Sequence, residues 1–196
     1  MTELRALTPH SAIPEQQAGR DRNQKRLLRS FLPELVQLER QLAEAPEQVT
    51  TTVAGEVAVR DLHLPIYRVD LGSTRDDVPA VLIVGGVHGL ERIGSQVVMA
   101  WLDSFLARLG WDDHLNALLE KVRITLLPIL NPGGMYLNQR GNPNGVDLMR
   151  NAPITAQDQS AFLLGGQRLS PRMPWYTGDP EQGMEPENLA LESVIQ

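Results

Sequence analysis

The feature that most constrains the fold is the stretch from Val81 to Ser95, VLIVGGVHGLERIGS. Its first four residues are aliphatic, and such a short apolar run is typical of a strand that is buried on both faces of a sheet. Two glycines end the run and allow a tight turn. From Ile93 to Leu109 apolar residues recur at intervals of mostly three and four, which predicts a helix. The stretch therefore predicts a strand, a loop and a helix, the repeating unit of α/β proteins.

Two side chains with metal-binding chemistry lie in that loop. His88 and Glu91 have the spacing HxxE, and open α/β sheets bind their ligands at this end of a strand. Imidazole nitrogen and carboxylate oxygen are both zinc ligands. The spacing alone is equally compatible with a solvated glutamate and a histidine that bonds to backbone. The glycines match neither GxGxxG nor GxxxxGK[ST], which argues against a nucleotide-binding loop.

Composition narrows the class of protein. A chain of 196 residues can form one sizeable core. The net charge of −6 argues against a nucleic-acid partner, because phosphate binding requires clustered Lys and Arg. The lack of cysteine excludes disulfides and thiolate metal sites. There is no apolar segment of signal-peptide or membrane-spanning length, so we expect a cytoplasmic protein without a membrane partner.

The N-terminal part should differ from the rest of the chain. Residues 1–20 are polar and resemble a loose arm, which makes His10 an improbable ligand. Residues 22–45 have a helical apolar face that Pro33 interrupts, either as a kink or as the start of a second helix. We expect this face to pack in the core: Leu28, Phe31, Leu35, Leu38 and Leu42. Residues 1–49 are thus expected to form an arm and helix, and residues 50–196 the main domain.

The main domain should be a mixed, largely parallel twisted sheet flanked by helices. Residues 50–60 and 62–71 partly alternate apolar and polar, as half-buried strands do. Pro65 should lie at an edge or strand start, and His63 should point to the surface. A short helix with surface His114 is expected over residues 112–119, and an apolar strand over 122–130, parallel to the first. Asn131 to Gly134 should then turn the chain out of this strand.

A second motif, NQRGNPNGVDLMRN, spans residues 138–151. It is rich in glycine and asparagine, so we expect an extended loop. Arg140 and Arg150 flank its centre, and a guanidinium binds a carboxylate through two parallel hydrogen bonds. Asp147 could hold one of the two arginines. Taken alone, the motif is more typical of an ordinary solvated loop with ion pairs than of a binding site.

The motifs together resemble the zinc metallocarboxypeptidase family, of the carboxypeptidase A/B type. GGVHGLE, LNPGG, RGNPNGVDLMRN and a final PWYTGDPEQGMEPENLALESV occur in the order of that family. The resemblance runs from about Thr51 to the C-terminus and covers the N-terminal portion of the family's catalytic domain. It implies the family's α/β/α fold, apparently truncated at the C-terminus.

The resemblance also implies an activity and a set of roles. The family removes C-terminal residues from peptides with a zinc-activated water. By resemblance, His88 and Glu91 would be zinc ligands, and Arg140 would stabilise the oxyanion of the tetrahedral intermediate. Arg150 and Asn151 would bind the carboxylate of the substrate. Zinc would polarise the carbonyl and lower the pKa of its bound water to about 7.

This chain departs from the family pattern in several places. Met149 replaces the usual asparagine, Gly133 replaces the aspartate of N-P-D-G, and Met184 replaces a serine. No histidine follows His114, so the family's third ligand and general-base glutamate are not expected here. A catalytic zinc normally has three protein ligands. We therefore expect weak zinc binding and little or no catalysis from these 196 residues alone.

Two other functions remain open. One is a zinc-dependent deacylase of N-acyl amino acids, similar to the succinylglutamate desuccinylase and aspartoacylase group. The other is a non-catalytic module that binds carboxylates through Arg140 and Arg150. In each case the expected partner is a peptide or an N-acyl amino acid with a free carboxylate.

Overall fold

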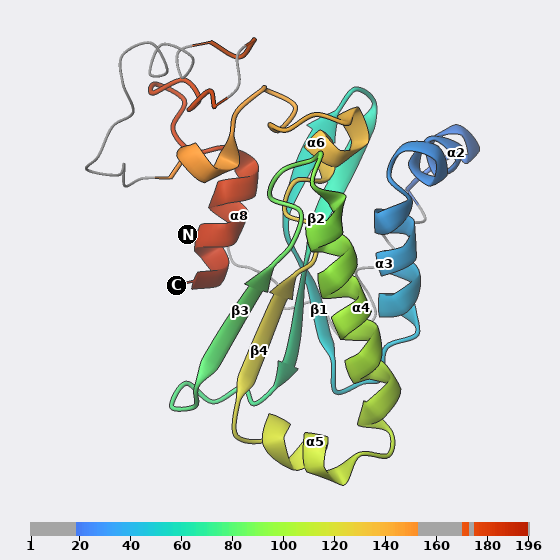
Figure 1. The fold of residues 1–196 in the computed structure, drawn as a ribbon. Helices are drawn as coiled ribbons and strands as arrows, with labels where there is room; N and C mark the ends of the chain where they lie inside the picture. Colours follow the sequence, from blue (N-terminus) through green and yellow to red (C-terminus); the bar gives the residue numbers. More distant parts are fainter. Residues whose placement is uncertain (1–18, 153–169, 173–174, 196) are drawn as a thin grey trace.

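The computed structural model describes residues 19–152, 170–172 and 175–195 (Figure 1). The expected arm with His10 lies almost wholly outside them. The strands are β1 (Thr50–Val59), β2 (Leu62–Gly72), β3 (Ala80–Val84) and β4 (Arg123–Leu127). The helices are α2 (Arg22–Phe31), α3 (Pro33–Ala43), α4 (Arg92–Leu109), α5 (Asp113–Leu119), α6 (Pro132–Leu137), the 3-10 turn η1 (Leu148–Arg150) and α8 (Pro186–Ile195). None of the described helices is long and apolar enough to cross a membrane.

The four strands form one mixed sheet in the order β1-β2-β4-β3. The expected parallel pair is present, because β3 runs parallel to β4. The pairs β1–β2 and β2–β4 are antiparallel. The mixed α/β class is therefore confirmed, although among the described strands the parallel share of the sheet is smaller than predicted. β4 is shorter than residues 122–130 and stops before Pro128, which has no amide hydrogen to donate to a neighbour.

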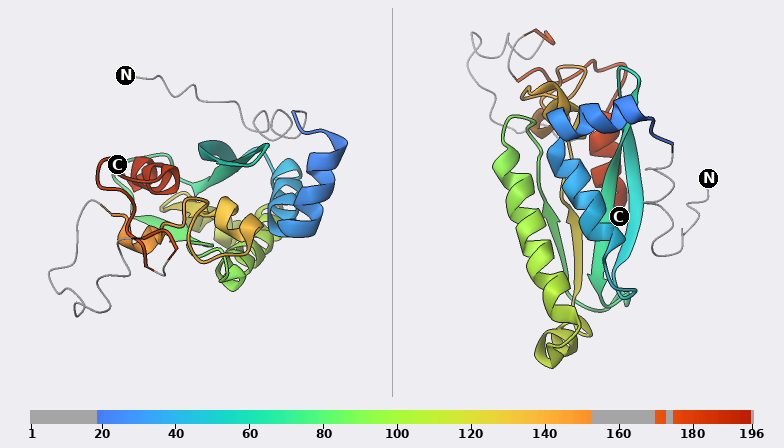
Figure 2. Two further views of the ribbon diagram at one scale, coloured as in Figure 1. Left: turned by 90° about the horizontal axis from the view of Figure 1, so that it is seen from above. Right: turned by 90° about the vertical axis from the view of Figure 1, so that its right-hand side faces the viewer.

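Helices cover both faces of this sheet. Helices α3 and α4 lie on one face, and α8 packs against β1 and β2 on the other (Figures 1 and 2). Gly55 of β1 permits this close approach of α8, because a Cβ there would come within 2.9 Å of Cβ of Ala190. Helix α4 turns five apolar or small residues to the core, at the spacing expected for one buried face: Ser95, Val98, Met99, Leu102 and Leu109.

The N-terminal region folds as two helices. Pro33 starts the second helix rather than kinking the first, which suits a residue whose missing amide hydrogen is not needed in a first turn. The expected core residues of this region are buried except Phe31, which is half exposed. Its ring instead meets the edge of Tyr136 of α6 at a centroid distance of 5.6 Å. The prediction that Phe31 belongs to the core is therefore wrong, because this contact leaves one side of the ring in solvent.

Several local predictions are confirmed and one is corrected. His63 and His114 are both exposed. Pro65 lies in the part of β2 that pairs only with β1, which is locally an edge. The expected turn at Asn131 to Gly134 instead begins helix α6. The Asn131 side chain caps that helix by accepting a hydrogen bond from the backbone nitrogen of Gly134 at 2.7 Å.

Strand β3 is the outermost strand of the described sheet, and this corrects its expected burial. Val81 is 50% exposed, and the three residues after it are only half buried. Helix α4 exposes further apolar side chains, Ile93 and Val97. An unpaired parallel edge beside exposed apolar residues invites pairing with another chain.

We expect the isolated 196-residue chain to self-associate through this edge, and Val81→Lys to reduce the association. A lysine on an edge strand opposes pairing because its charge would have to be desolvated. Sedimentation velocity over a range of concentrations measures the effect. Leu118→Lys adds the same charge to an exposed apolar residue of α5 and should leave the association unchanged. Equal association of the Val81 variant and the unmodified chain would contradict the edge as the cause.

Candidate active site

The loop after β3 is tied to the loop after β4. The carbonyl oxygen of Gly85 accepts a hydrogen bond from the nitrogen of Leu130, and that of Gly86 accepts one from Asn131, both at 2.9 Å. Gly86 has a φ of +63°, a conformation that glycine adopts without strain. These bonds extend the parallel pairing past the ends of the strands. They fix the start of the His88 loop at the carboxyl edge of the sheet.

His88 and Glu91, called the ligand pair below, face each other. Nδ1 of His88 lies 3.1 Å from Oε1 of Glu91. The imidazole is nearly buried, with 12% of the side chain exposed, whereas Glu91 is 59% exposed. The backbone nitrogen of Glu91 donates to the carbonyl oxygen of His88, a turn that brings the two side chains to one side. The expected convergence of these two residues is present.

Residues 138–151, called the arginine loop below, bring Arg140 to the same point. The loop is held there because the nitrogen of Gly89 donates to the carbonyl oxygen of Arg140 at 3.1 Å. A side chain at Gly89 would overlap the backbone of Gly134, so this close approach requires glycine. The guanidinium of Arg140 lies 3.2 Å from Oε1 of Glu91 and 3.0 Å from Nε2 of His88.

Asp147 is the buried centre of the site. Only 2% of its side chain is exposed, and its carboxylate lies 3.2 Å from Nε2 of His88 and 3.2 Å from Nε of Arg140. Nε of Arg150 is 3.7 Å away. The sequence indicated that Asp147 could hold one arginine. The structure shows it between both arginines and the histidine.

The two contacts of Nε2 of His88 require different tautomers of the imidazole. A guanidinium only donates, so its contact with Nε2 requires an unprotonated Nε2, whereas a hydrogen bond to Asp147 requires Nε2–H. When Nε2–H donates a hydrogen bond to Asp147, Nδ1 is unprotonated and its lone pair points toward Glu91. That form is the one that can bind a metal together with Glu91, and a carboxylate behind the ring is the usual way in which proteins set it.

Arg150 also lies close to the site, but it faces an aromatic ring. Its guanidinium carbon is 5.8 Å from the ring centroid of Trp175, within range of a cation–π contact. Arg140 and Arg150 are each about one-third exposed, at 36% and 37%. Both can therefore reach a solvent-borne anion while Asp147 holds their positions.

The side-chain amide of Asn151 forms hydrogen bonds inside the protein and does not face an open binding site. Its side-chain nitrogen donates to the carbonyl oxygens of Thr177 and Gly183, and its side-chain oxygen accepts from the backbone nitrogen of Glu185 at 2.7 Å. Both polar atoms of the amide are thus used inside the protein. This geometry gives no support to the predicted role of Asn151 in substrate binding.

A polar network that the sequence analysis did not single out holds the arginine loop. Nδ2 of Asn142 donates to the carboxylates of Glu185 at 2.7 Å and Glu187 at 3.1 Å, both at the start of α8. Oδ1 of Asn142 accepts from the backbone nitrogens of Asn144 and Val146. The asparagine-rich run and the EPE sequence were the available signals. Neither signal shows which side chains meet.

The ligand pair fits a zinc ion in part. Two zinc ligands at 2.0–2.2 Å in a tetrahedral arrangement lie about 3.3–3.6 Å apart, a few tenths of an ångström more than the observed 3.1 Å. Among the described residues no group of three His, Cys, Asp or Glu side chains could hold a metal. The carboxylate of Asp147 lies on the Nε2 side of the ring, so it serves the histidine and not the same metal position.

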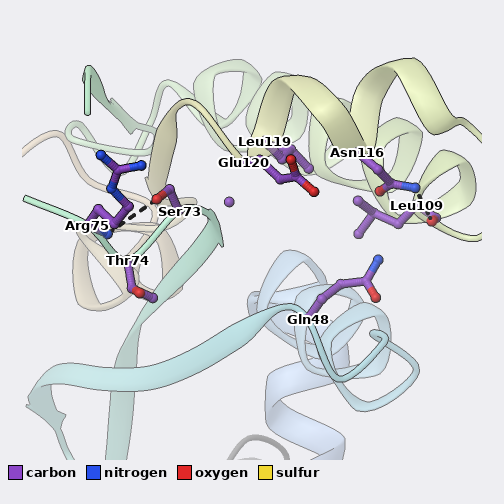
Figure 3. A pocket seen from close by; sticks show the side chains of 9 residues that line it. Gln48, Ser73, Thr74, Arg75, Leu109, Asn116, Leu119 and Glu120 are labelled. Carbon is purple, nitrogen blue, oxygen red and sulfur yellow. Dashed lines mark hydrogen bonds between the residues drawn. The ribbon is translucent and has the colours of Figure 1, made fainter. Parts of the chain in front are cut away.

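Two cavities differ in their relation to the site. A cavity of about 380 Å³ adjoins it and is lined by Leu90, Gln139, Arg140, Gly141, Gly145, Asp147, Pro171, Arg172 and Trp175. A larger one of about 630 Å³ lies at the other end of the sheet, between Gln48, the end of β2 and helix α5 (Figure 3). Its lining includes Ser73, Asn116 and Glu120, and the ligand pair is not among its residues.

Known proteins share both the sequence pattern and the fold. Residues 35–196 match the family described as "Zinc carboxypeptidase". Carboxypeptidase SOL1 of Arabidopsis thaliana is 27% identical over 92 residues, which is 45% of this chain and 19% of that protein. Carboxypeptidase E of Caenorhabditis elegans is 29% identical over 135 residues, which is 60% of this chain and 29% of that protein. The chain therefore spans less than a third of either relative.

A solved structure supports the fold. Thrombin-activatable fibrinolysis inhibitor superposes with a TM-score of 0.63 at 20% identity, over 93% of this chain and 49% of that one. The family match begins at residue 35, within α3 and before the boundary expected at residue 50. Because the match covers most of the chain, from the second helix to the last residue, the protein belongs to the zinc carboxypeptidase family of hydrolases.

Proposed function

We propose that this chain carries the zinc-binding pair and the carboxylate-binding arginines of a metallocarboxypeptidase-like hydrolase. The observation that supports it most is the convergence of His88, Glu91 and Arg140 around the buried carboxylate of Asp147. This convergence does not follow from contacts between neighbours along the chain, because 49 positions separate Glu91 from Arg140. The substrate would be a peptide with a free C-terminal carboxylate.

Each residue has a role that its geometry suits. His88 and Glu91 would hold zinc, which when bound supplies a Lewis acid and an activated water. Arg140 would donate hydrogen bonds to the developing oxyanion, and removal of such a donor typically costs about 3–4 kcal/mol of transition-state stabilisation. Arg150 would bind the terminal carboxylate of the substrate. Asp147 would orient the imidazole and both arginines.

Zinc binding provides the first test. The isolated chain should bind zinc through the ligand pair, but weakly, because two protein ligands leave more positions open than a catalytic site has. Competition with a chromogenic chelator measures the affinity. His88→Ala and Glu91→Ala should each abolish binding, and His63→Ala, on the exposed face of β2, should not. Zinc held equally by the His88→Ala variant would remove the ligand pair from this role.

A deacylase of N-acyl amino acids is the second candidate. It is favoured by Met149, which is 66% exposed where the family has an asparagine, so this position offers no amide to a terminal carboxylate. Hydrolysis assays on C-terminal peptides and on N-acyl amino acids, with zinc supplied, separate the two activities. Turnover of N-acyl amino acids alone would select the deacylase.

A further inference from the structure

The cavity of about 380 Å³ beside the ligand pair has more positive than negative side chains in its wall. Leu90, which lies between His88 and Glu91 in the sequence, forms part of its wall, so the cavity opens directly next to the site. Its wall carries the cations of Arg140 and Arg172. Among the described lining residues the one acid is Asp147, which is buried and already faces two arginines. The wall is therefore basic, although the chain as a whole has a net charge of −6.

Arg172 has no role in the site described above. Among the described residues no carboxylate lies within 4 Å of its guanidinium, and the side chain is exposed. Its position against the arginine loop is nevertheless defined. A Cβ at Gly145, which has a φ of +79°, would come within 2.6 Å of the carbonyl oxygen of Pro171, so the residue before Arg172 lies directly on this loop.

Trp175 gives the cavity an apolar and aromatic wall. Its φ is +67°, and a bulky residue in this left-handed region is a rare backbone state. Such strain is of order 1–3 kcal/mol and is found most often where a side chain is held for function. The guanidinium carbon of Arg150 lies 5.8 Å from the centroid of this ring. Arg150 itself does not line the cavity, but Trp175 does, so the predicted carboxylate-binding arginine lies beside the cavity that Arg172 lines.

We propose that this cavity binds a second anionic group of the substrate, with Arg172 as its partner, so that the preferred substrates are acidic. Such a substrate carries one carboxylate for Arg150 and another, on a neighbouring residue, for Arg172. A guanidinium fork binds a carboxylate through two parallel hydrogen bonds. The volume is at the low end of the range of small-ligand sites, about 300–1,000 Å³. This inference rests on the proposed function only for the first carboxylate.

Two ligands that differ in one charge test the proposal. N-acetyl-Glu-Ala and N-acetyl-Gln-Ala have the same shape and the same terminal carboxylate. Isothermal titration calorimetry on the 196-residue chain needs no turnover. The glutamate ligand should bind about three- to fivefold more tightly, as for a partly exposed ion pair. Arg172→Gln should abolish this preference without changing the affinity for the glutamine ligand, and Arg172→Glu should reverse it.

Two further variants distinguish a failure of the second anionic subsite from a failure of the proposed role of Arg150. Arg75→Gln removes an exposed arginine beside the other cavity and should keep the preference. Arg150→Gln should weaken both ligands equally. Equal affinity of the unmodified chain for both ligands would overturn the second anionic subsite and leave the proposed function standing. A preserved glutamate preference with no effect of Arg150→Gln would support the subsite and refute the proposed role of Arg150.

Discussion

Replacing Asp147 with alanine should lower the zinc affinity of the chain about 10- to 100-fold, the usual effect of removing the carboxylate behind a metal-binding histidine. The reason is that Asp147 contacts Nε2 of His88, and without it nothing favours the tautomer that presents Nδ1. The variant should also lose roughly 2 kcal/mol of stability. It removes the carboxylate that caps η1 by accepting a hydrogen bond from the backbone nitrogen of Met149. It also leaves Arg140 and Arg150 without their shared partner.

The stability loss should stay modest because both arginines are about one-third exposed and water can replace the carboxylate. Chelator competition and urea denaturation measure the two effects separately. Asp147→Asn keeps the shape and an acceptor oxygen, so it should retain more stability than the alanine variant while still weakening zinc binding. Asp77→Ala, in an exposed pair with Arg75, should change neither quantity. Unaltered zinc affinity of the Asp147→Ala variant would exclude Asp147 as the residue that orients His88.

Asn142→Asp should destabilise the fold by about 3 kcal/mol or more at neutral pH. Nδ2 of Asn142 is the shared donor to Glu185 and Glu187, and the substitution replaces it with a third carboxylate in a buried position. A substitution that places like charges together in a buried position, without enough hydrogen-bond donors, causes one of the largest losses of stability that a single residue can cause. The arginine loop should also lose its position, because the same network binds it to α8. Urea denaturation at pH 7 measures the change.

An exposed asparagine of the same loop provides the control. Asn138→Asp makes the same chemical change at the end of α6, where Asn138 is exposed and has a φ of 53°. Aspartate tolerates that backbone state nearly as well as asparagine, so the stability should change by less than about 0.5 kcal/mol. Similar losses in the two variants would show that the polar network contributes no specific stability.

The same network predicts how stability depends on pH. Burial raises the pKa of the Glu187 carboxyl, and the neighbouring charge of Glu185 raises it further. The folded state then binds this proton more tightly than the unfolded state. The free energy of unfolding should therefore fall as the pH rises from the ordinary glutamate pKa of 4.5 through the raised value. Asn142→Asp should make this fall steeper, and Glu187→Gln should remove its contribution.

Local elements of this protein could be predicted from local sequence. The apolar run at β3, the glycines after it and the spacing of apolar residues in α4 each act over a few positions. The start of a helix at Pro33 was one of two alternatives that the sequence allowed. Asn131 was misinterpreted as part of a plain turn, because a Pro-Gly-Gly sequence is typical both of turns and of a capped first helical turn.

Site residues could be proposed because their chemistry and their spacing coincide in two motifs. His88 with Glu91 and Arg140 with Arg150 were each identified in this way, and the motif order connected them to one family. Asn151 lies next to Arg150 in the same motif, but the motif does not show how its side chain is bonded. Its amide is used by backbone groups of Thr177, Gly183 and Glu185.

The sequence by itself determined most of the helices and strands, and which side chains could bind zinc or a carboxylate, because these properties depend mainly on neighbours along the chain. Only the tertiary structure decided which of them meet. Asp147 joins His88 to both arginines, Asn142 joins the arginine loop to α8, and β3 lies at an exposed edge. The contact between His88 and Asp147 joins positions 59 residues apart, and that between Asn142 and Glu185 joins positions 43 residues apart. The exposure of β3 depends on the strand order. Local spacing carries no information about any of these.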